Sequence, residues 1–166
     1  LASFQTGKAK IMTMRKAFHG RTSGAVAATD NPSIQAPFNK TANIVFTTMG
    51  DLDEAESNLA TGEFAAVMIE GMQGVAGIID PGTEYLRGLR SLCDKYGAKL
   101  ILDEVQSGCG RTGRYYAHQH AGIKADIVTM AKGIANGFPV GAIAISPDFE
   151  ARDGMLGTTF GGSHLA

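Results

Sequence analysis

The stretch KLILD, from Lys99 to Asp103, is an apolar run that ends in an acid, and it decides the fold class. Its apolar positions are continuous and do not alternate with polar ones, which is typical of a strand buried on both faces of a parallel sheet. A second run of this type, Ile127 to Met130, comes shortly before Lys132. The interval between Asp103 and Lys132 is long enough for the crossover segment that two parallel strands require.

Four other apolar runs have the length and composition of strands: Lys10 to Met14, Ile44 to Thr47, Ala65 to Glu70 and Gly141 to Ile145. Helix signals alternate with these runs. Asp51 is expected to cap a helix, with Glu54 reaching back to it. The segment Thr83 to Tyr96 carries one apolar face and stops at Gly97. Alternating strands and helices predict one α/β domain with a mostly parallel, doubly wound sheet.

The composition indicates a globular domain that binds a small molecule. Hydrophobic residues make up 44% of the 166 residues and charged residues 19%, so the chain can bury a core. A net charge of −1 gives no electrostatic footprint for nucleic acid. Apolar stretches such as Phe64 to Ile69 are too short to cross a bilayer. Cys93 and Cys109 form no C-x-x-C pair, so we expect reduced thiols in a cytoplasmic protein.

Three ionisable residues fall at predicted strand ends, namely Glu70, Asp103 and Lys132. Ligands bind at the carboxyl ends of strands in sheets of this type. Each charge alone is more often an ordinary loop residue, but three of them on one edge favour a binding site. A lysine in a glycine-rich, apolar setting is a candidate Schiff-base former, and a carboxylate at the neighbouring strand end suits a pyridinium nitrogen.

Two further segments have side chains that suit such a site. After the first strand, Phe18 can stack on a planar ring, and Arg21 offers a planar fork for a carboxylate. Near the C-terminus, Thr158 and Thr159 stand just before a glycine pair. Hydroxyls and free amides near a helix start suit a phosphate group, and a simple turn leading into a helix explains this segment equally well.

Two other patterns invite competing interpretations. The segment Gly108 to Gly113 matches G-x-G-x-x-G, but it does not follow a strand directly and the next acid, Asp126, comes too early for a dinucleotide site. A mobile glycine loop is therefore favoured. His118 and His120 have no cysteine nearby, so solvated histidines on a helix face are favoured over a metal site.

Five motifs follow one another along the chain: FHGRT (Phe18 to Thr22), EGMQG (Glu70 to Gly74), LDEVQSGCGRTG (Leu102 to Gly113), MAKG (Met130 to Gly133) and TTFGG (Thr158 to Gly162). In this order the chain resembles the class III aminotransferases, which use pyridoxal phosphate in the fold type I architecture. The resemblance runs through essentially the whole chain. It implies that residues 1–166 are part of the cofactor-binding large domain, without the family's N-terminal segment and C-terminal small domain, and that such a piece is inactive alone.

The resemblance implies a role for each residue around the cofactor. Lys132 is expected to bind the cofactor as a Schiff base and later to move a proton between substrate and cofactor. Asp103 is expected to keep the pyridine nitrogen protonated, and Gln106 to bond the phenolic oxygen. Val105 and Phe18 are expected to pack on the two faces of the ring.

The resemblance also implies contacts to the substrate and to a second subunit. Arg21 matches the arginine that holds the substrate α-carboxylate, and Glu70 lies in the family's substrate-binding motif. Thr159, with Thr158 beside it, matches the phosphate contact that a neighbouring subunit donates. A homodimer with shared active sites is therefore expected, acting on an amino donor and a 2-oxo acid.

Within the family, the motifs are most similar to members that transfer the δ-amino group of N-acetylornithine to 2-oxoglutarate in cytoplasmic arginine biosynthesis. Three departures bear on this expectation. Gly71 stands where many members have proline, Val75 where many have a second acid, and Ser163-His164 where Asn-Pro is usual. Because that second acid partners a switching arginine, Val75 leaves the donor open between N-acetylornithine, succinylornithine, ornithine and 4-aminobutyrate.

Two functions from other classes compete with transamination. A nicotinamide-dependent oxidoreductase would use the loop from Gly108 to Gly113. A binding module that has kept the fold and lost catalysis is disfavoured, because such decay removes the nucleophile first. Lys132, Asp103 and Gln106 are all present in this chain.

Overall fold

The computed structural model describes residues 1–150, 152–159, 161–162 and 164. In sequence order, the strands of this part of the chain are β1 (Lys10–Met14), β2 (Ile44–Thr47), β3 (Phe64–Glu70), β4 (Lys99–Asp103), β5 (Ile127–Met130) and β6 (Ala142–Ile145). The α-helices are α1 (Ala2–Thr6), α2 (Ser23–Ala27), α3 (Leu52–Leu59) and α4 (Thr83–Tyr96). Short 3₁₀ helices are η1 (Pro32–Ile34), η2 (Pro37–Asn39), η3 (Ala117–Ala121) and η4 (Lys132–Ala135).

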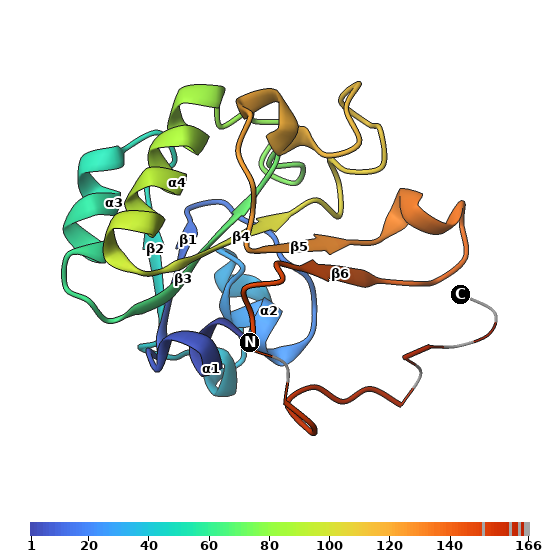
Figure 1. The fold of residues 1–166 in the computed structure, drawn as a ribbon, viewed down its shortest axis with the longest axis horizontal. Coiled ribbons are helices and arrows are strands. Elements are labelled where there is room, and N and C mark those ends of the chain that lie inside the picture. Colours follow the sequence, from blue (N-terminus) through green and yellow to red (C-terminus); the bar gives the residue numbers. More distant parts are fainter. Residues whose placement is uncertain (151, 160, 163, 165–166) are drawn as a thin grey trace.

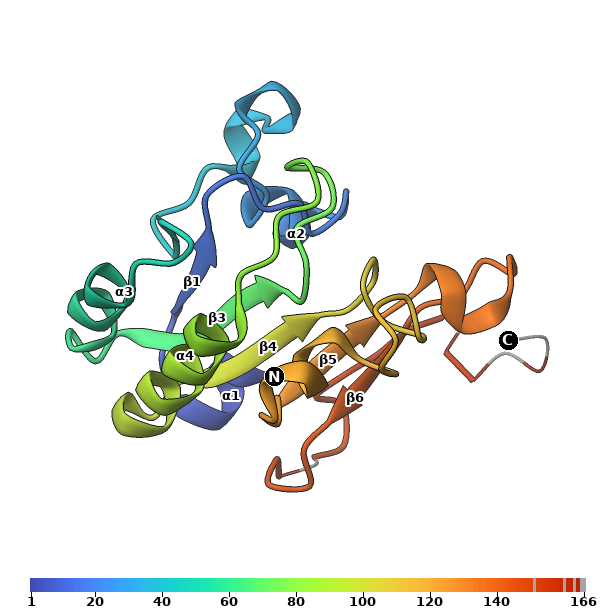
Figure 2. The same cartoon turned by 90° about the horizontal axis from the view of Figure 1, so that it is seen from above.

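The strands form one sheet in the order β2-β1-β3-β4-β5-β6 (Figures 1 and 2). All pairs are parallel except β5 with β6, which is antiparallel. The predicted α/β class and mostly parallel sheet are confirmed. Each predicted strand is present, and only β3 and β6 begin one residue away from the expected position. Such differences lie within the normal uncertainty of element ends.

The two faces of the sheet pack against different helices. Helices α3 and α4 lie side by side (Figure 1). They share a core with alternate residues of the central strands: Met12, Met14, Val67, Ile69, Leu100 and Leu102. Ala2 of α1 packs against Ala66 and Ile101. Since neighbouring residues of a strand point to opposite faces, α1 covers the face that α3 and α4 leave free.

Helix boundaries follow the predicted local signals, with one correction. Gly97 ends α4 in the left-handed conformation (φ 62°), and its N–H donates to the Cys93 carbonyl. Asp51 caps α3 by accepting from the Glu54 N–H at 2.8 Å. The prediction that Glu54 reaches back to Asp51 is wrong: its carboxylate accepts from the Thr48 N–H at 2.8 Å. The Asp51 N–H already donates to the Thr48 carbonyl at 3.2 Å, so it has no need of Glu54.

The two thiols differ in burial, and this gives a first test of the packing. Burial on the inner face of α4 raises the pKa of the Cys93 thiol to about 12, whereas Cys109 is partly exposed. Because the thiolate is the reactive form, iodoacetamide at mildly alkaline pH is expected to label Cys109 and spare Cys93 until the chain is unfolded. Peptide mass spectrometry with and without urea measures this. Labelling of native Cys93 at the rate of Cys109 would show that the core is packed differently.

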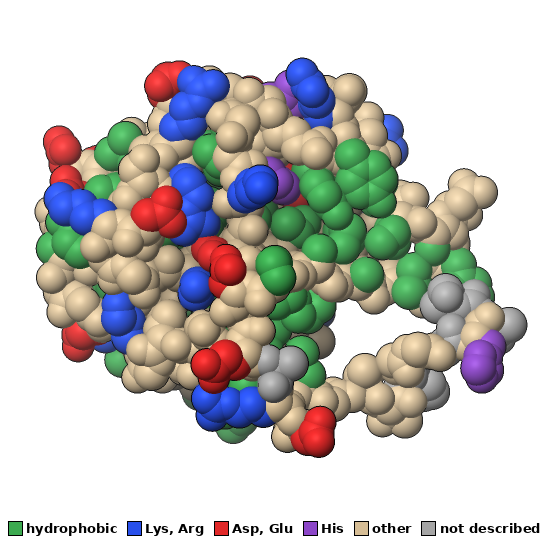
Figure 3. Space-filling model, viewed as in Figure 1, with side chains coloured by type: hydrophobic (Ala, Val, Ile, Leu, Met, Phe, Trp, Pro, Cys, Tyr) green, Lys and Arg blue, Asp and Glu red, His purple; other side chains and the backbone are tan. Residues whose placement is uncertain are grey.

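Hydrophobic side chains also gather on the surface near β5 and β6 (Figure 3). Ile143 and Ile145 of β6 are exposed, as is Phe138 in the turn before that strand. Contiguous exposed apolar surface usually marks a contact with another protein segment. Among the described residues, none of the helices combines the length and the apolarity needed to span a bilayer.

Candidate active site

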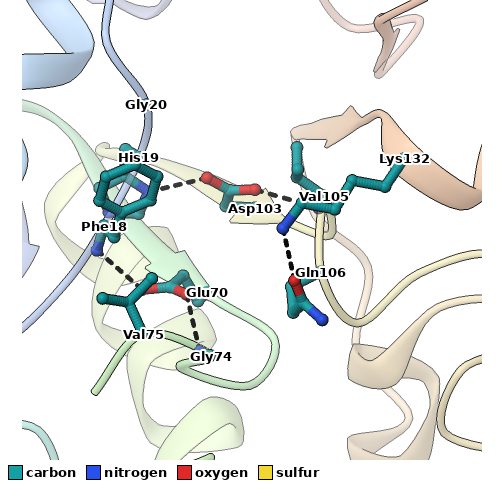
Figure 4. A pocket seen from close by; sticks show the side chains of 10 residues that line it. All are labelled: Phe18, His19, Gly20, Glu70, Gly74, Val75, Asp103, Val105, Gln106 and Lys132. Carbon is teal, nitrogen blue, oxygen red and sulfur yellow. Dashed lines mark hydrogen bonds and ion pairs between the residues drawn. The ribbon is translucent and has the colours of Figure 1, made fainter. Parts of the chain in front are cut away.

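A cavity of about 100 Å³ lies at the carboxyl edge of the sheet (Figure 4). Glu70 and Asp103 are the last residues of β3 and β4 and are paired in the strand register. Lys132 comes two residues after β5. The predicted convergence of these residues is confirmed. The residues that line the cavity are Phe18, His19, Gly20, Glu70, Gly74, Val75, Asp103, Val105, Gln106 and Lys132.

Asp103 is held by bonds to both of its carboxylate oxygens. Oδ2 lies 2.8 Å from Nδ1 of His19, and Oδ1 accepts from the Val105 N–H at 3.1 Å. The His19 ring is fully buried, and its Nε2 lies 3.1 Å from the Thr13 hydroxyl. Asp103 itself is only 6% exposed. A nearly buried carboxylate with fixed orientation can hold a cationic partner within the cavity.

Glu70 connects two walls of the cavity. Its Oε1 accepts from the Phe18 N–H at 3.0 Å, and its Oε2 accepts from the Gly74 N–H at 3.1 Å. Burial raises the pKa of the Glu70 carboxyl, and the two amide bonds oppose that rise. Glu70 therefore fixes the backbone beside Phe18 as well as lining the cavity.

Lys132 is the first residue of η4. Its backbone adopts the left-handed conformation (φ 49°), which for a residue other than glycine costs about 1–2 kcal/mol. The Nζ donates to Oε1 of Gln106 on the side of the cavity that faces Phe18 and Glu70 (Figure 4). Such backbone strain is typical of positions where function fixes the direction of a side chain.

The remaining predicted site residues divide into two groups. Phe18, Val105 and Gln106 line the cavity, and Phe18 and Val105 stand on either side of Asp103 (Figure 4). Arg21, Thr158 and Thr159 are exposed and are not among the lining residues. Phe160 of the TTFGG motif and Ser163 lie outside the described residues.

The structure corrects the interpretation of His118, whereas His120 is exposed as predicted. His118 is 5% exposed, and its Nδ1 lies 2.8 Å from Oε1 of Glu104, so it is not a solvated residue. His120 is exposed and bonds the Thr112 carbonyl at 2.9 Å. Within the described part of the chain, no three potential metal ligands come together.

The glycine segment from Gly108 to Gly113 forms turns and not the start of a helix. Gly110 and Gly113 have positive φ (86° and 87°), and the next helical element, η3, begins at Ala117. A dinucleotide site needs a helix that opens on the glycines to receive the pyrophosphate. The structure therefore lacks the geometry that the nicotinamide interpretation requires.

Sequence reasoning left two of the lining residues without a clear role. His19 follows Phe18 directly, so its position in FHGRT places it near the site, but its bond to Asp103 depends on a partner 84 residues away. Val75 departs from the family's usual acid at this position, and the structure places it on the cavity wall with 72% of its surface exposed. For both residues, their place in or next to a family motif was the sequence signal that could have predicted their position at the cavity.

The cavity suits a flat aromatic group with a basic nitrogen. Phe18 and Val105 offer apolar surfaces on either side of the Asp103 carboxylate, which matches a ring with a cationic nitrogen. Lys132 and Gln106 supply an amine and an amide at the same cavity. The residues present therefore fit a pyridoxal-type cofactor.

A mostly parallel α/β sheet with a lysine, a carboxylate and an aromatic ring at its carboxyl edge defines a lysine-dependent cofactor-binding domain of fold type I. More narrowly, the chain belongs to the class III aminotransferase family. The family described as "Aminotransferase class-III" matches residues 2–166. The family and fold predicted from the motifs are thus confirmed.

Curated relatives and solved structures agree with this assignment. The chain is 45% identical to the acetylornithine aminotransferase of Mycolicibacterium smegmatis, covering 95% of this chain and 41% of the relative. It is 42% identical to the enzyme of that name from Streptococcus mutans, covering 100% and 44%. The ornithine aminotransferase of Toxoplasma gondii superposes with a TM-score of 0.86 at 30% identity, covering 93% and 38%. The chain spans about two fifths of the length of the curated relatives it matches.

Proposed function

We propose that residues 1–166 belong to a pyridoxal-phosphate-dependent aminotransferase that transfers the δ-amino group of N-acetylornithine to 2-oxoglutarate. The observation that carries the chemistry is the meeting of Lys132, Asp103 and Gln106 at one cavity. The names of the relatives, at 41–45% identity, support the choice of amino donor. Because these relatives are much longer than this chain, the activity is proposed for the full-length protein.

Pyridoxal phosphate, when bound, supplies an electron-withdrawing ring that stabilises negative charge on the carbon bearing the amino group. Asp103, oriented by His19 and the Val105 N–H, places a carboxylate where the protonated ring nitrogen would lie. The side chains of Phe18 and Val105 flank the ring and exclude water from it. Gln106 offers an amide to the ring oxygen. Lys132 would act as the base: its Nζ would take a proton from the substrate carbon that bears the amino group and pass it to the bound cofactor.

One residue on the cavity wall affects which amino donor the full-length enzyme is expected to accept. Val75 adds an apolar, largely exposed side chain on the wall that also contains Gly74 and Glu70. Since this position carries no charge, the chain does not offer a carboxylate for a switching arginine there. Succinylornithine, ornithine and 4-aminobutyrate therefore stand as the alternative donors within the same family.

The proposal extends to the rest of the enzyme. We infer that residues 1–166 are part of the large domain, and that further segments and a second subunit complete the site in a cytoplasmic homodimer. The exposed apolar surface around Phe138 and Ile143 supports additional contacts. Thr158 and Thr159 lie outside the cavity lining and are exposed, which agrees with a role in a neighbouring active site. Arg21 is proposed to bind the α-carboxylate of the substrate in the active site of its own subunit.

The amino donor can be tested by steady-state kinetics on the full-length protein. With 2-oxoglutarate as acceptor, kcat/KM for N-acetylornithine is expected to exceed that for ornithine or 4-aminobutyrate by roughly tenfold or more, the scale of discrimination that a few pocket contacts provide. Pyridoxal phosphate is expected to raise the melting temperature, and NAD to leave it unchanged. A preference for 4-aminobutyrate would overturn the donor assignment, and stabilisation by NAD alone would overturn the reaction class.

A further inference from the structure

Glu104 is a buried acid that stands between two cavity residues but does not line the cavity. Asp103 before it and Val105 after it both face the site, whereas the Glu104 side chain is fully buried on the other side of the chain. A fully buried carboxylate is costly unless several donors satisfy it.

Four donors reach the Glu104 carboxylate, and all come from residues 107–118. The Ser107 hydroxyl lies 2.5 Å from Oε2, and the Ala117 N–H donates to the same oxygen at 3.1 Å. The N–H of His118 donates to Oε1 at 3.0 Å, and the ring Nδ1 of His118 lies 2.8 Å from that oxygen. The carboxylate thus joins the beginning and the end of the segment 104–118, which carries Val105 and Gln106.

The backbone after β3 closes over the same carboxylate. A Cβ at Gly71 would stand 2.9 Å from both carboxylate oxygens and 2.7 Å from the Ser107 hydroxyl. A side chain at this position would therefore force the Glu104 carboxylate or the Ser107 hydroxyl to shift, and glycine avoids that displacement. Gly71 follows Glu70 directly, and the cluster is therefore in contact with a second wall of the cavity.

A further link runs from this cluster to the strand that presents the lysine. The His118 ring stacks on Tyr116, with centroids 5.3 Å apart and an interplanar angle of 14°. The Tyr116 hydroxyl donates to Sδ of Met130 at 3.1 Å. Met130 is the last residue of β5, two positions before Lys132. The cluster therefore contacts residues next to both members of the Lys132–Gln106 bond. Ser107 follows Gln106 directly, and Tyr116 connects His118 to Met130, two residues before Lys132.

We propose that Glu104 is a positioning residue, which clamps both ends of the segment 104–118 and so fixes Val105 and Gln106 against the bound cofactor. His118 is its principal partner, and Ser107 and Gly71 complete the enclosure. This inference rests on the proposed use of pyridoxal phosphate.

The charge state of Glu104 agrees with such a clamp. Burial by itself raises the pKa of this carboxyl, but the bonds from His118, Ser107 and Ala117 outweigh burial and lower it. Glu104 is therefore ionised at neutral pH, where each of its four bonds is charge-assisted and correspondingly strong.

The substitution Glu104→Gln tests the clamp in the full-length protein. Glutamine keeps the shape but has one acceptor oxygen, so it cannot accept all four bonds. We expect the Kd for pyridoxal phosphate, measured by absorbance titration of the apoprotein, to rise roughly ten- to hundredfold. The visible circular dichroism of the bound cofactor is expected to change, because the ring is held at a different angle. Ser107→Ala, which removes one donor, is expected to give smaller changes of the same kind.

Glu56→Gln is the matched control. The Glu56 carboxylate also accepts two side-chain bonds, from Lys95 and Tyr96, but it lies on the surface of α3 away from the cavity. Its substitution is expected to leave the Kd and the dichroism unchanged. If Glu104→Gln does not fold, Ser107→Ala decides the question by the same readouts.

The outcomes separate this inference from the proposed function. Variants that lower the melting temperature of the apoprotein but bind the cofactor with wild-type affinity and dichroism would reduce Glu104 to a purely structural role and overturn the inference alone. A wild-type protein that does not bind pyridoxal phosphate would overturn the proposed function, and the positioning role with it.

Discussion

Lys132→Ala in the full-length protein is expected to lower kcat by roughly 10⁴-fold, since both the covalent attachment and the proton transfer depend on its Nζ. Lys132 stands at the cavity, is bonded to Gln106, and is held there in the left-handed backbone conformation. Steady-state transamination of N-acetylornithine measures the loss. Borohydride reduction of the wild-type protein with pyridoxal phosphate is expected to modify the peptide that contains Lys132, and the variant is expected to show no such adduct.

Two controls separate the lysine's chemistry from its charge. Lys132→Arg retains a cation but has no nucleophilic amine, so its kcat is expected to fall as far as that of the alanine variant. Lys124→Ala, at an exposed position outside the cavity lining, is expected to retain full activity. Substantial activity in Lys132→Arg, or an adduct on a different lysine, would show that Lys132 only supplies charge.

The strands were predictable because burial on both faces of the sheet requires apolar residues at successive positions, and such a run is visible in the sequence. β3 and β4 are apolar without alternation, since both faces of the sheet are covered at these positions. The end of α4 was also predictable from the local sequence, because Gly97 supplies the left-handed residue that ends the helix. The interaction of Glu54 was not predictable, because it depends on whether the Asp51 N–H is already bonded to the turn before the helix.

The site was predictable as far as strand direction determines it. Parallel strands bring their carboxyl ends to one edge, so Glu70, Asp103 and Lys132 could be placed together from their positions alone. Contacts behind that edge were not predictable. The burial of His118 depends on its pairing with Glu104, and the role of His19 depends on Asp103, and both pairings follow from tertiary packing. The residues next to His118 and His19 in the sequence do not indicate that these side chains are buried.

Asp103→Asn is expected to give the second largest loss, because it removes charge while keeping shape. The asparagine can still accept from the Val105 N–H and stay beside His19, so the cavity is expected to persist. An opposite charge in contact changes a protonation equilibrium roughly 10- to 1000-fold. The ring nitrogen is therefore expected to lose its proton in the variant.

The loss of that proton would weaken the electron-withdrawing power on which proton removal by Lys132 depends, so kcat is expected to fall roughly 10²–10³-fold with little change in the apoprotein's melting temperature. Stopped-flow half-reactions with the amino donor measure the step directly. Asp53→Asn, in the first turn of α3, is the matched control and is expected to behave as wild type. Wild-type rates in Asp103→Asn would mean that this carboxylate orients the pocket through His19 and Val105 without acting on the ring charge.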